Sequence, residues 1–560
     1  MANISLVEYT GGLNQHSAPD LINANQSPMM VNVTLDQEGS FGSRLGSQLL
    51  KLFTGTDKVR GIGIQKRSDG TERPFYAVSG ALRYYNGTDW DATASGTDQI
   101  SDAYDVSFSM FKEHLYYISA KDSEYLMKVS DAATPVISEV DSTNHYEGKY
   151  VASGNARLLL AGSHRFPNRV FHSQVDSDKF SIIRATVSSV SSLNLTLTSA
   201  LFTFSMNGWR IYNITRDEEA WIEAITSTTV ASLTRIASLS SWVSTDELLI
   251  MYDFVDIDEA VTGMCSLGEQ TPFLLFSKSD AYIYDPSADY VRKMSGFGCV
   301  NGKNLRVING NAIWVNYDGI FRYSSGMAYP VKISLPLENE LTFDKIWNKT
   351  TKAGLDASAA WADSNKYYVS IGDLSATVDG QTLNDVVLVF NLNQQVWQVR
   401  TYTANGLGYC FEEFVDATLG RVKLSGSRDD TALLRWDVIN VYTDDDLEDA
   451  PVAYTALYRT KHFEYEAFEK SKLILEGHMK GYIGTAMDVK VSLSGSQTYV
   501  DWTTTDTTPA GYDWHYMTLA PLYPSTCKSI SLEFSGTGKW HIYNVGLDLK
   551  TEKTSNLNRV

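Results

Sequence analysis

Cysteine is scarce in this sequence. Its four cysteines lie far apart, and no two of them form a Cys-x-x-Cys pair: Cys265, Cys299, Cys410 and Cys527. This spacing argues against a structural zinc site, which needs ligands in close pairs. A chain of 560 residues needs no disulfides to fold, so scattered cysteines are typical of a protein made in a reducing cytoplasm.

Long apolar runs are also missing. No stretch approaches the roughly 20 consecutive apolar residues with which a helix crosses a bilayer. The start of the chain, Met1-Ala-Asn-Ile-Ser5, has no basic segment followed by an apolar one. The sequence therefore predicts a soluble protein with no membrane segment and no secretion signal.

Motifs for catalysis and cofactor binding are absent. There is no Gly-x-x-x-x-Gly-Lys-Ser/Thr loop for phosphates, and no Gly-x-Ser-x-Gly elbow between a strand and a helix. The acidic run 444–449 lacks the spacing of a calcium loop, so we interpret it as a solvated linker. The sequence therefore predicts a protein that is not an enzyme, with no catalytic residue, no cofactor and no metal. One alternative stays open: two carboxylates that are distant in sequence and meet only in the fold could catalyse glycoside hydrolysis.

The charge is strongly one-sided. Asp and Glu number 66 against 47 Lys and Arg, which gives a net charge of −19. Such a surface repels nucleic acid, because affinity for the phosphate backbone comes from Lys and Arg. An acidic wall would suit a conduit through which DNA passes, and the alternative is that acidity only serves solubility.

Short strands dominate the sequence. Aromatic residues reach 12% of the chain, with 32 Tyr, which favours pleated surfaces. Residues 73–78 and 81–85 alternate in polarity around Ser79-Gly80, a pair typical of a hairpin turn. Groups of three or four such strands recur every 40 to 50 residues or so, which predicts an all-β chain built around a β-propeller. A series of sandwiches or barrels remains the alternative. Further strands are expected near 104–110, 114–118, 156–161, 273–276, 311–315, 319–323, 366–371, 385–390, 396–399 and 432–436.

Three segments stand outside the propeller pattern, which we expect over 51–185 and 257–443. Residues 186–256 are rich in Ser and Thr and hold several short strands, which predicts an inserted small β-barrel or sandwich. Residues 444–560 predict a separate C-terminal antiparallel β domain. Residues 1–50 are predicted to form an extended N-terminal arm, because short apolar anchors alternate with polar and turn-forming residues.

The arm contains the most distinctive sequence of the chain. Tyr9-Thr-Gly-Gly-Leu-Asn14 leads to Asn32-Val-Thr-Leu-Asp36 and then to Gly39-Ser-Phe-Gly-Ser-Arg-Leu-Gly46. These stretches resemble the N-terminal arm of the β-propeller tail nozzle family (tail tubular protein B) of short-tailed bacteriophages. A second stretch with an order similar to that family runs from Phe273 to Ser334, and residues 363–397 look like its next blade.

The resemblance implies a structural virion protein. Members of this family form a six-fold ring below the portal and adaptor rings, retain packaged double-stranded DNA and pass it at ejection. Tail fibres or spikes dock on the ring. It thus implies a homo-oligomer without a cofactor, located in the virion tail and assembled in the host cytoplasm.

Contacts between subunits of such a ring are expected from the arm, which could add a strand to a neighbouring sheet. Its glycines and proline keep it from folding on itself. The candidate contact residues are Tyr9, Gly11, Gly12, Leu13, Pro19 and Arg44.

Other functions remain open. One alternative is a tail protein that binds a receptor or binds and degrades a polysaccharide, with Tyr and Trp lining a sugar groove. Another is a bacterial propeller that binds a small ligand or a protein. A related hub or stopper of another tail type is a third, and no motif identifies residues that gate a lumen.

Overall fold

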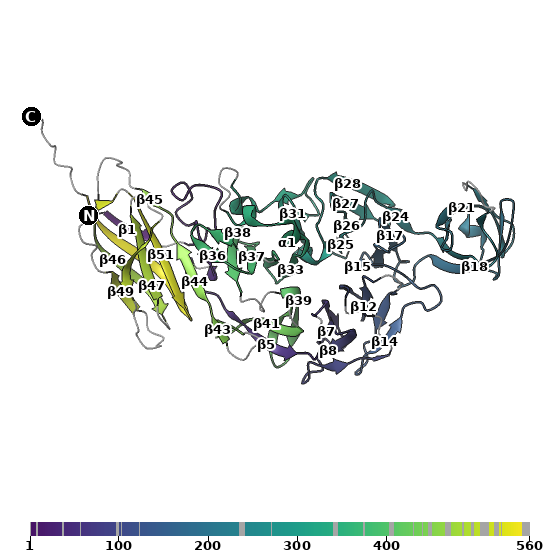
Figure 1. Cartoon of the computed structure of the whole chain (residues 1–560), viewed down its shortest axis with the longest axis horizontal. Helices are drawn as coiled ribbons and strands as arrows, with labels where there is room; N and C mark the ends of the chain where they lie inside the picture. The colour runs from purple at the N-terminus through teal and green to yellow at the C-terminus, as the bar shows by residue number, and fades with distance from the viewer. Residues whose placement is uncertain are drawn as a thin grey trace, which may run out of the picture. The chain divides into compact units, whose positions relative to one another are not determined.

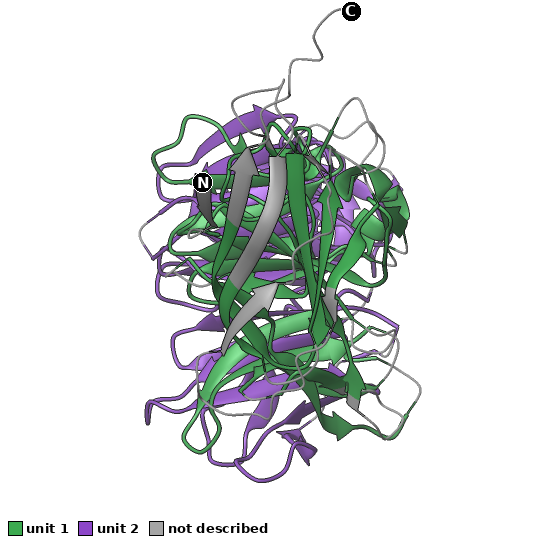
Figure 2. Ribbon diagram, turned by 90° about the vertical axis from the view of Figure 1, so that its left-hand side faces the viewer, with its two compact units in different colours: residues 1–59, 303–560 green, residues 60–302 purple. Residues whose placement is uncertain are grey.

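The computed structural model divides the chain into two compact units, each described here by itself (Figure 2). Unit 1 comprises residues 1–59 and 303–560, and unit 2 comprises residues 60–302. The structure describes residues 2–551 except 7–8, 36–38, 56–57, 97–99, 102, 122–123, 235–240, 270, 340–344, 373, 375, 403–407, 429–430, 440, 446–450, 465–471, 484–486, 494–497, 505–514, 520–525 and 528.

Unit 2 contains four consecutive small sheets, labelled in part in Figure 1. The first has β6 (Gly61–Lys66), β7 (Glu72–Val78), β8 (Ala81–Tyr84) and β9 (Ala92–Thr93), and the second has β10 (Ser95–Gly96), β11 (Val106–Phe111), β12 (His114–Ser119), β13 (Met127–Val129) and β14 (Val136–Glu139). The third has β15 (Tyr150–Gly154), β16 (Arg157–Ala161), β17 (Arg169–His172) and β24 (Phe254–Asp256), and the fourth has β25 (Gly263–Ser266), β26 (Phe273–Phe276), β27 (Asp280–Asp285) and β28 (Tyr290–Ser295).

These sheets are arranged as propeller blades. Neighbouring strands in all four sheets are antiparallel except β10 and β14, which pair in parallel, and the edge strands β6, β11, β15 and β25 of successive sheets contact one another in turn. Apolar side chains fill the space between sheets, as Phe75, Leu115 and Tyr117 do between the first two. The turn at Ser79-Gly80 has positive φ at both residues (48° and 70°), as its sequence predicts. The predicted all-β propeller class is confirmed.

A closed six-stranded barrel is inserted into the third sheet. The chain leaves β17, forms the barrel and returns as β24, which pairs with β17. Its core is apolar and includes Leu195, Ile211 and Trp242. The predicted small β domain is therefore a barrel rather than a sandwich. Its elements are β18 (Ile182–Ser191), β19 (Asn194–Leu197), η1 (Phe204–Met206), β20 (Arg210–Asn213), β21 (Glu218–Ile225), β22 (Val230–Thr234) and β23 (Glu247–Met251).

Unit 1 continues the same pattern. One sheet holds β29 (Arg306–Ile308), β30 (Asn311–Asn316), β31 (Gly319–Ser324) and β32 (Val331–Lys332). The next begins with β33 (Ala359–Ala362), β34 (Lys366–Ser370), β37 (Val386–Asn391) and β38 (Val396–Thr401), and a third holds β39 (Gly408–Asp416), β40 (Gly420–Ser427) and β41 (Ala432–Val438). The edge strands β29, β33 and β39 contact one another in turn, as the blade arrangement requires.

The C-terminal part of unit 1 is made of antiparallel strands, seen in yellow in Figure 1, and it is not the separate domain that the sequence predicts, because it belongs to the same compact unit as the preceding blades. Strands β44, β51, β47 and β48 are neighbours in one sheet, and β52, β46 and β49 are neighbours in another. The elements are β44 (Thr455–Arg459), β45 (Phe463–Glu464), β46 (Lys472–Ile483), β47 (Met487–Leu493), β48 (Val500–Thr504), β49 (His515–Leu519), β50 (Thr526–Cys527), β51 (Ser529–Thr537) and β52 (Trp540–Thr551).

Helices are few and short in the described part of the chain. They are η3 (Gly302–Asn304), η4 (Leu335–Leu337), η5 (Trp347–Lys349) and α1 (Lys352–Asp356) beside η1, and two hairpins complete the fold: β35 (Ala376–Val378) with β36 (Gln381–Leu383), and β42 (Thr443–Asp445) with β43 (Pro451–Ala453). Within the described ranges, none of the helices has the length and apolar character needed to cross a membrane.

The N-terminal segment, defined here as residues 2–52, contributes strands to three sheets of unit 1. Its strands are β1 (Ala2–Leu6), β2 (Met30–Val31), β3 (Val33–Leu35), β4 (Phe41–Ser43) and β5 (Gly46–Leu52). Strands β1 and β4 pair with β52. The short β2 lies between β38 and β44, so it joins a blade to the C-terminal strands as one ten-stranded sheet. Strand β5 completes the last blade by pairing with β41.

An ionic cluster, formed by Asp363, Arg400, Lys423 and Asp437, links the last two blades of unit 1. Lys423 Nζ lies 2.9 Å from Asp363 Oδ2 and 2.7 Å from Asp437 Oδ2, and Arg400 Nη1 lies 2.7 Å from Asp437 Oδ1. Burial alone would raise the pKa of Asp437, but Arg400 and Lys423 hold it well below its usual range. The cluster therefore holds its charges at neutral pH.

Gly46 in β5 tests how tightly the N-terminal segment fits. A Cβ on Gly46 would lie 1.9 Å from the Thr443 carbonyl oxygen, which belongs to backbone and cannot rotate away. We expect Gly46→Ala to lower the free energy of unfolding by roughly 1–3 kcal/mol, measured by urea denaturation. Gly326→Ala is the control, because no atom lies within 4 Å of the position of its added Cβ. Equal stability of the two variants would contradict the close approach.

The ionic cluster predicts an acid-sensitive contribution to stability. Because the folded pKa of Asp437 is lowered from an unfolded value of about 3.9, its contribution is complete above that value and is lost as pH falls below it. We expect Asp437→Asn to cost about 3 kcal/mol at pH 7 and clearly less near pH 3, measured by urea denaturation at both values.

Asp176→Asn serves as the control, because Asp176 is 71% exposed and lies 3.7 Å from its partner Lys112. A cost of Asp437→Asn that did not change with pH would show that the carboxylate charge is not what stabilises the contact between the two blades.

Candidate functional site

The residues predicted to contact a neighbouring subunit all contact their own chain. Tyr9 is 2% exposed and packs edge-on against Phe41 and Tyr458, with ring centroids 4.6 and 5.7 Å apart. Leu13 is also 2% exposed, and its backbone N–H donates to the Trp397 carbonyl. These two side chains act as apolar anchors of the N-terminal segment on unit 1.

The small residues of the segment make close backbone approaches. Gly12 has a φ of 64°, and a Cβ there would lie 2.5 Å from Val396 Cβ, so glycine is required on both counts. The Gly11 N–H donates to the Asn25 carbonyl, and the Pro19 carbonyl accepts from the backbone N–H of His462. Contacts of these residues with a second subunit stay a prediction.

Arg44 forms the polar centre of the site. It follows β4, is fully buried, and its guanidinium donates five hydrogen bonds. Two go to the Asp444 carboxylate, from Nη1 at 2.9 Å and from Nη2 at 2.5 Å. The others reach Asn32 Oδ1 and the carbonyls of Leu45 and Thr401. All five N–H donors of an arginine are thereby used.

Two tyrosine rings flank the Arg44 guanidinium. Its Cζ lies 4.3 Å from the ring centroid of Tyr402 and 3.8 Å from that of Tyr454, within the range of cation–π attraction. Burial alone would lower the pKa of Arg44, but Tyr402 and Asp444 raise it. Arg44 is thus held as a cation in a site closed to water, and the Tyr454 hydroxyl donates to its carbonyl.

Asn32 connects the same centre to two further strands. Its φ of 56° is in the left-handed region, which asparagine tolerates better than most residues. Its Nδ2 donates to Thr401 Oγ1 at 2.8 Å and to the Thr455 carbonyl at 3.0 Å, and its Oδ1 accepts from the Thr401 N–H. One amide therefore ties the N-terminal segment to β38 and β44.

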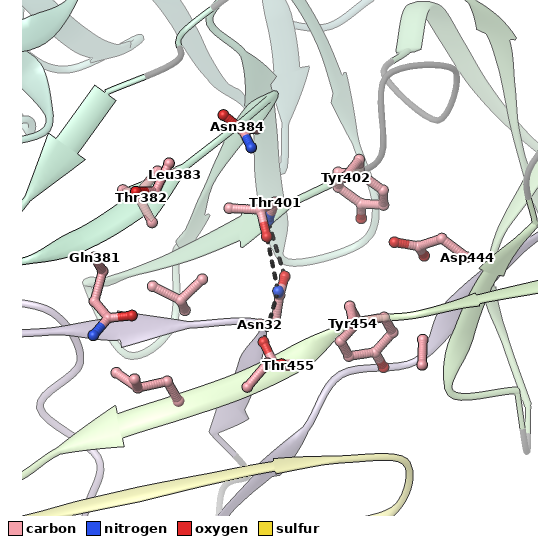
Figure 3. Close-up of a pocket in the computed structure, with 13 residues that line it drawn as sticks. Asn32, Gln381, Thr382, Leu383, Asn384, Thr401, Tyr402, Asp444, Tyr454 and Thr455 are labelled. Atoms are coloured by element: carbon pink, nitrogen blue, oxygen red, sulfur yellow. Dashed lines mark hydrogen bonds between the residues drawn. The ribbon is translucent and has the colours of Figure 1, made fainter.

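A cavity of about 250 Å³ lies beside these groups (Figure 3). Its labelled walls come from the N-terminal segment, from residues 381–384 beside β36, from the end of β38 and from the chain around β43 and β44. Hydroxyl and amide groups dominate the lining, and the carboxylate of Asp444 is already paired with Arg44. The cavity can hydrogen-bond a small neutral polar molecule, but it has no free general base.

Two further observations concern metal-binding and nucleophilic groups elsewhere in the described residues. No group of three or more His, Cys, Asp or Glu residues within those ranges is arranged to hold a metal ion. Burial raises the pKa of the Cys299 thiol well above its usual range, which keeps it protonated and a poor nucleophile.

The partner of Arg44 could not be predicted from the sequence. Asp444 was assigned to a solvated acidic linker, and this is wrong for that residue: it is 1% exposed, lies in β42 and pairs with Arg44. Residues 446–449 of the same run lie outside the described residues. No local signal distinguishes Asp444 from its acidic neighbours, because its partner is 400 positions away.

Comparisons with known proteins give remote likenesses only. No family model matches the sequence, and no curated protein matches it. Among solved structures, YCF48 from Cyanidioschyzon merolae is similar with 8% identity and a TM-score of 0.35, over 70% of this chain and 98% of that one. U3-55K has 6% identity and a TM-score of 0.34, over 70% and 98%.

A third similar structure is the exo-β-1,3-galactanase Pc1,3Gal43A from Phanerochaete chrysosporium, determined with galactose. It has 10% identity and a TM-score of 0.19, over 81% of this chain and 99% of that one. Likenesses at these levels carry no argument about function, so the fold assignment rests on the sheets themselves.

The Arg44–Asp444 pair gives a direct test of the site. Arg44→Met leaves a buried carboxylate without its cation, and we expect a loss of about 3–5 kcal/mol in the free energy of unfolding. Arg44→Met combined with Asp444→Leu removes both charges, so we expect the double variant to recover part of this loss. Urea denaturation of the two single variants and the double variant gives the coupling energy. Additive losses would contradict the pairing.

Proposed function

We propose that this chain is a structural protein of a bacteriophage tail, a non-enzymatic nozzle subunit that forms a ring, retains packaged DNA and lines the path of its ejection. In this proposal it assembles in the host cytoplasm with portal-side adaptor proteins and with tail fibres or spikes. Double-stranded DNA passes through the ring without sequence-specific contacts.

The observation that carries the proposal is the course of the N-terminal segment. It completes the last blade through β5, links a blade to the C-terminal strands through β2, and adds β1 and β4 to the C-terminal sheet. The parts of unit 1 are thus held by several backbone ladders and by the hydrogen bonds of Arg44. To pull one part away from the others, all of these interactions must be broken together. Resistance to force is what a ring holding packaged DNA requires.

The second resembling stretch supports the same proposal. The stretch from Phe273 to Ser334 spans β26 to β32, so its apolar strand, glycine turn, Trp strand and Asp-Gly hairpin fall on two successive blades. Residues 363–397 run from the approach to β34 into β38 in the next blade. The net charge of −19 also suits a conduit, since an acidic wall has little affinity for the phosphate backbone of DNA passing through it.

A receptor-binding or polysaccharide-binding tail protein is the second candidate. The neutral hydroxyl and amide lining of the 250 Å³ cavity favours it, because such groups hydrogen-bond sugars. The two tyrosines count against it: Tyr402 and Tyr454 are 5% and 8% exposed and face Arg44, so neither offers a free ring for stacking on a sugar.

The copy number in purified phage particles tests the proposal. Quantitative mass spectrometry against the portal protein should give about six copies per particle, as a single closed ring requires. A higher multiple of three would favour a fibre or spike, and binding on a glycan array would then be the next measurement. Absence from particles would overturn the virion assignment altogether.

A further inference from the structure

A cleft of about 480 Å³ in unit 1, separate from the cavity of Figure 3, concentrates positive charge. It lies against β34, β38, β40 and β41, and the N-terminal segment closes one side of it. We call it the basic cleft. Its cationic residues are Lys366, Arg400, Arg421, Lys423 and Arg435.

Three of these cations are balanced by carboxylates. Arg400 and Lys423 belong to the ionic cluster with Asp363 and Asp437. Arg421 Nε lies 3.1 Å from Glu413 Oε1 at the exposed edge of the cleft. Five cations therefore meet three carboxylates, and the excess falls on Lys366 and Arg435.

Neither of the two remaining cations forms a direct ion pair with a carboxylate among the described residues. The Lys366 ammonium has no ion pair there, and Arg435 Nη2 donates only to the Leu419 carbonyl, at 3.1 Å. Burial and then Arg400 lower the pKa of Lys366, although the carboxylates of Asp437 and Asp363, which are paired with Arg400 and Lys423, act in the opposite direction. In a chain with a net charge of −19, two uncompensated cations in one cleft leave a local positive potential that a bound anion would relieve.

The walls of the cleft add an apolar component. Leu419 lines it and is half-buried, and Ile439 at its edge is 77% exposed. The cleft volume is in the range of small-molecule sites, roughly 300–1,000 Å³, and far exceeds what a bare oxyanion fills. A ligand with a compact anionic group on an apolar body fits both features.

We propose that the basic cleft binds a small organic phosphate monoester, with its phosphate between Lys366 and Arg435 and its apolar body against Leu419 and Ile439. A phosphate monoester carries close to two negative charges at neutral pH, which matches the two uncompensated cations, whereas a carboxylate supplies one. Arginine and lysine donors to phosphate form charge-assisted hydrogen bonds. The site does not depend on the virion assignment.

Calorimetric titration of the full chain with phenyl phosphate at pH 7.5 or so tests the proposal. We expect saturable binding that weakens with added salt, and binding at least about tenfold weaker in Lys366→Met and in Arg435→Met. Lys179→Met, at an exposed position of unit 2, should bind like the unchanged chain. Urea denaturation of each variant separates lost binding from lost folding, and Arg435→Met at the cleft margin is the variant least able to perturb the fold.

Benzoate and phenol, titrated alongside, identify which part of the ligand is recognised. Weaker binding of benzoate and none of phenol would support recognition of the phosphate. No binding of phenyl phosphate, binding equal to that of phenol, or binding unchanged in both Lys366→Met and Arg435→Met would overturn the proposal.

Discussion

The buried ion pair between Arg44 and Asp444 is the constraint on which the arrangement of unit 1 depends. An arginine out of water is tolerated only when its charge and all its donors are satisfied, and here one carboxylate, one amide and two carbonyls do so. These acceptors come from the N-terminal segment, β38 and β42. The N-terminal segment, β38 and β42 must therefore all be in place for the Arg44 guanidinium to have its full set of acceptors. This requirement favours one arrangement of the three segments.

Strand alternation places two kinds of polar site on neighbouring residues of β38. Arg400 lines the basic cleft, and the next residue, Thr401, lines the cavity beside Arg44. Successive side chains of a strand point to opposite faces, so one strand can serve both sites without a longer loop. The stacked rings of Trp361 and Tyr368, 3.6 Å apart, fill the apolar space beside the ionic cluster.

Local sequence patterns predicted many of the strands, but not how the N-terminal segment pairs with the rest of unit 1. Ser79-Gly80 specifies its hairpin because both residues adopt positive φ, and alternation around it locates β7 and β8. The barrel followed from a change in composition near residue 186. By contrast, β5 pairs with β41, and Arg44 pairs with Asp444, across nearly the whole chain. Such pairings depend on which strand edges and which charged side chains are still without a partner once the local hairpins have formed. A single sequence does not show this.

The two ways in which segments join the blades have different mechanical consequences. The chain enters and leaves the barrel at one sheet of unit 2, through β17 and β24, and the barrel strands pair only with one another, so the barrel meets the blades through side chains and not through shared ladders. The N-terminal segment enters three sheets of unit 1, so a change in it is felt in all of them. Substitutions in the barrel are therefore expected to disturb fewer ladders than substitutions in residues 2–52, which are constrained by the stability of unit 1 itself.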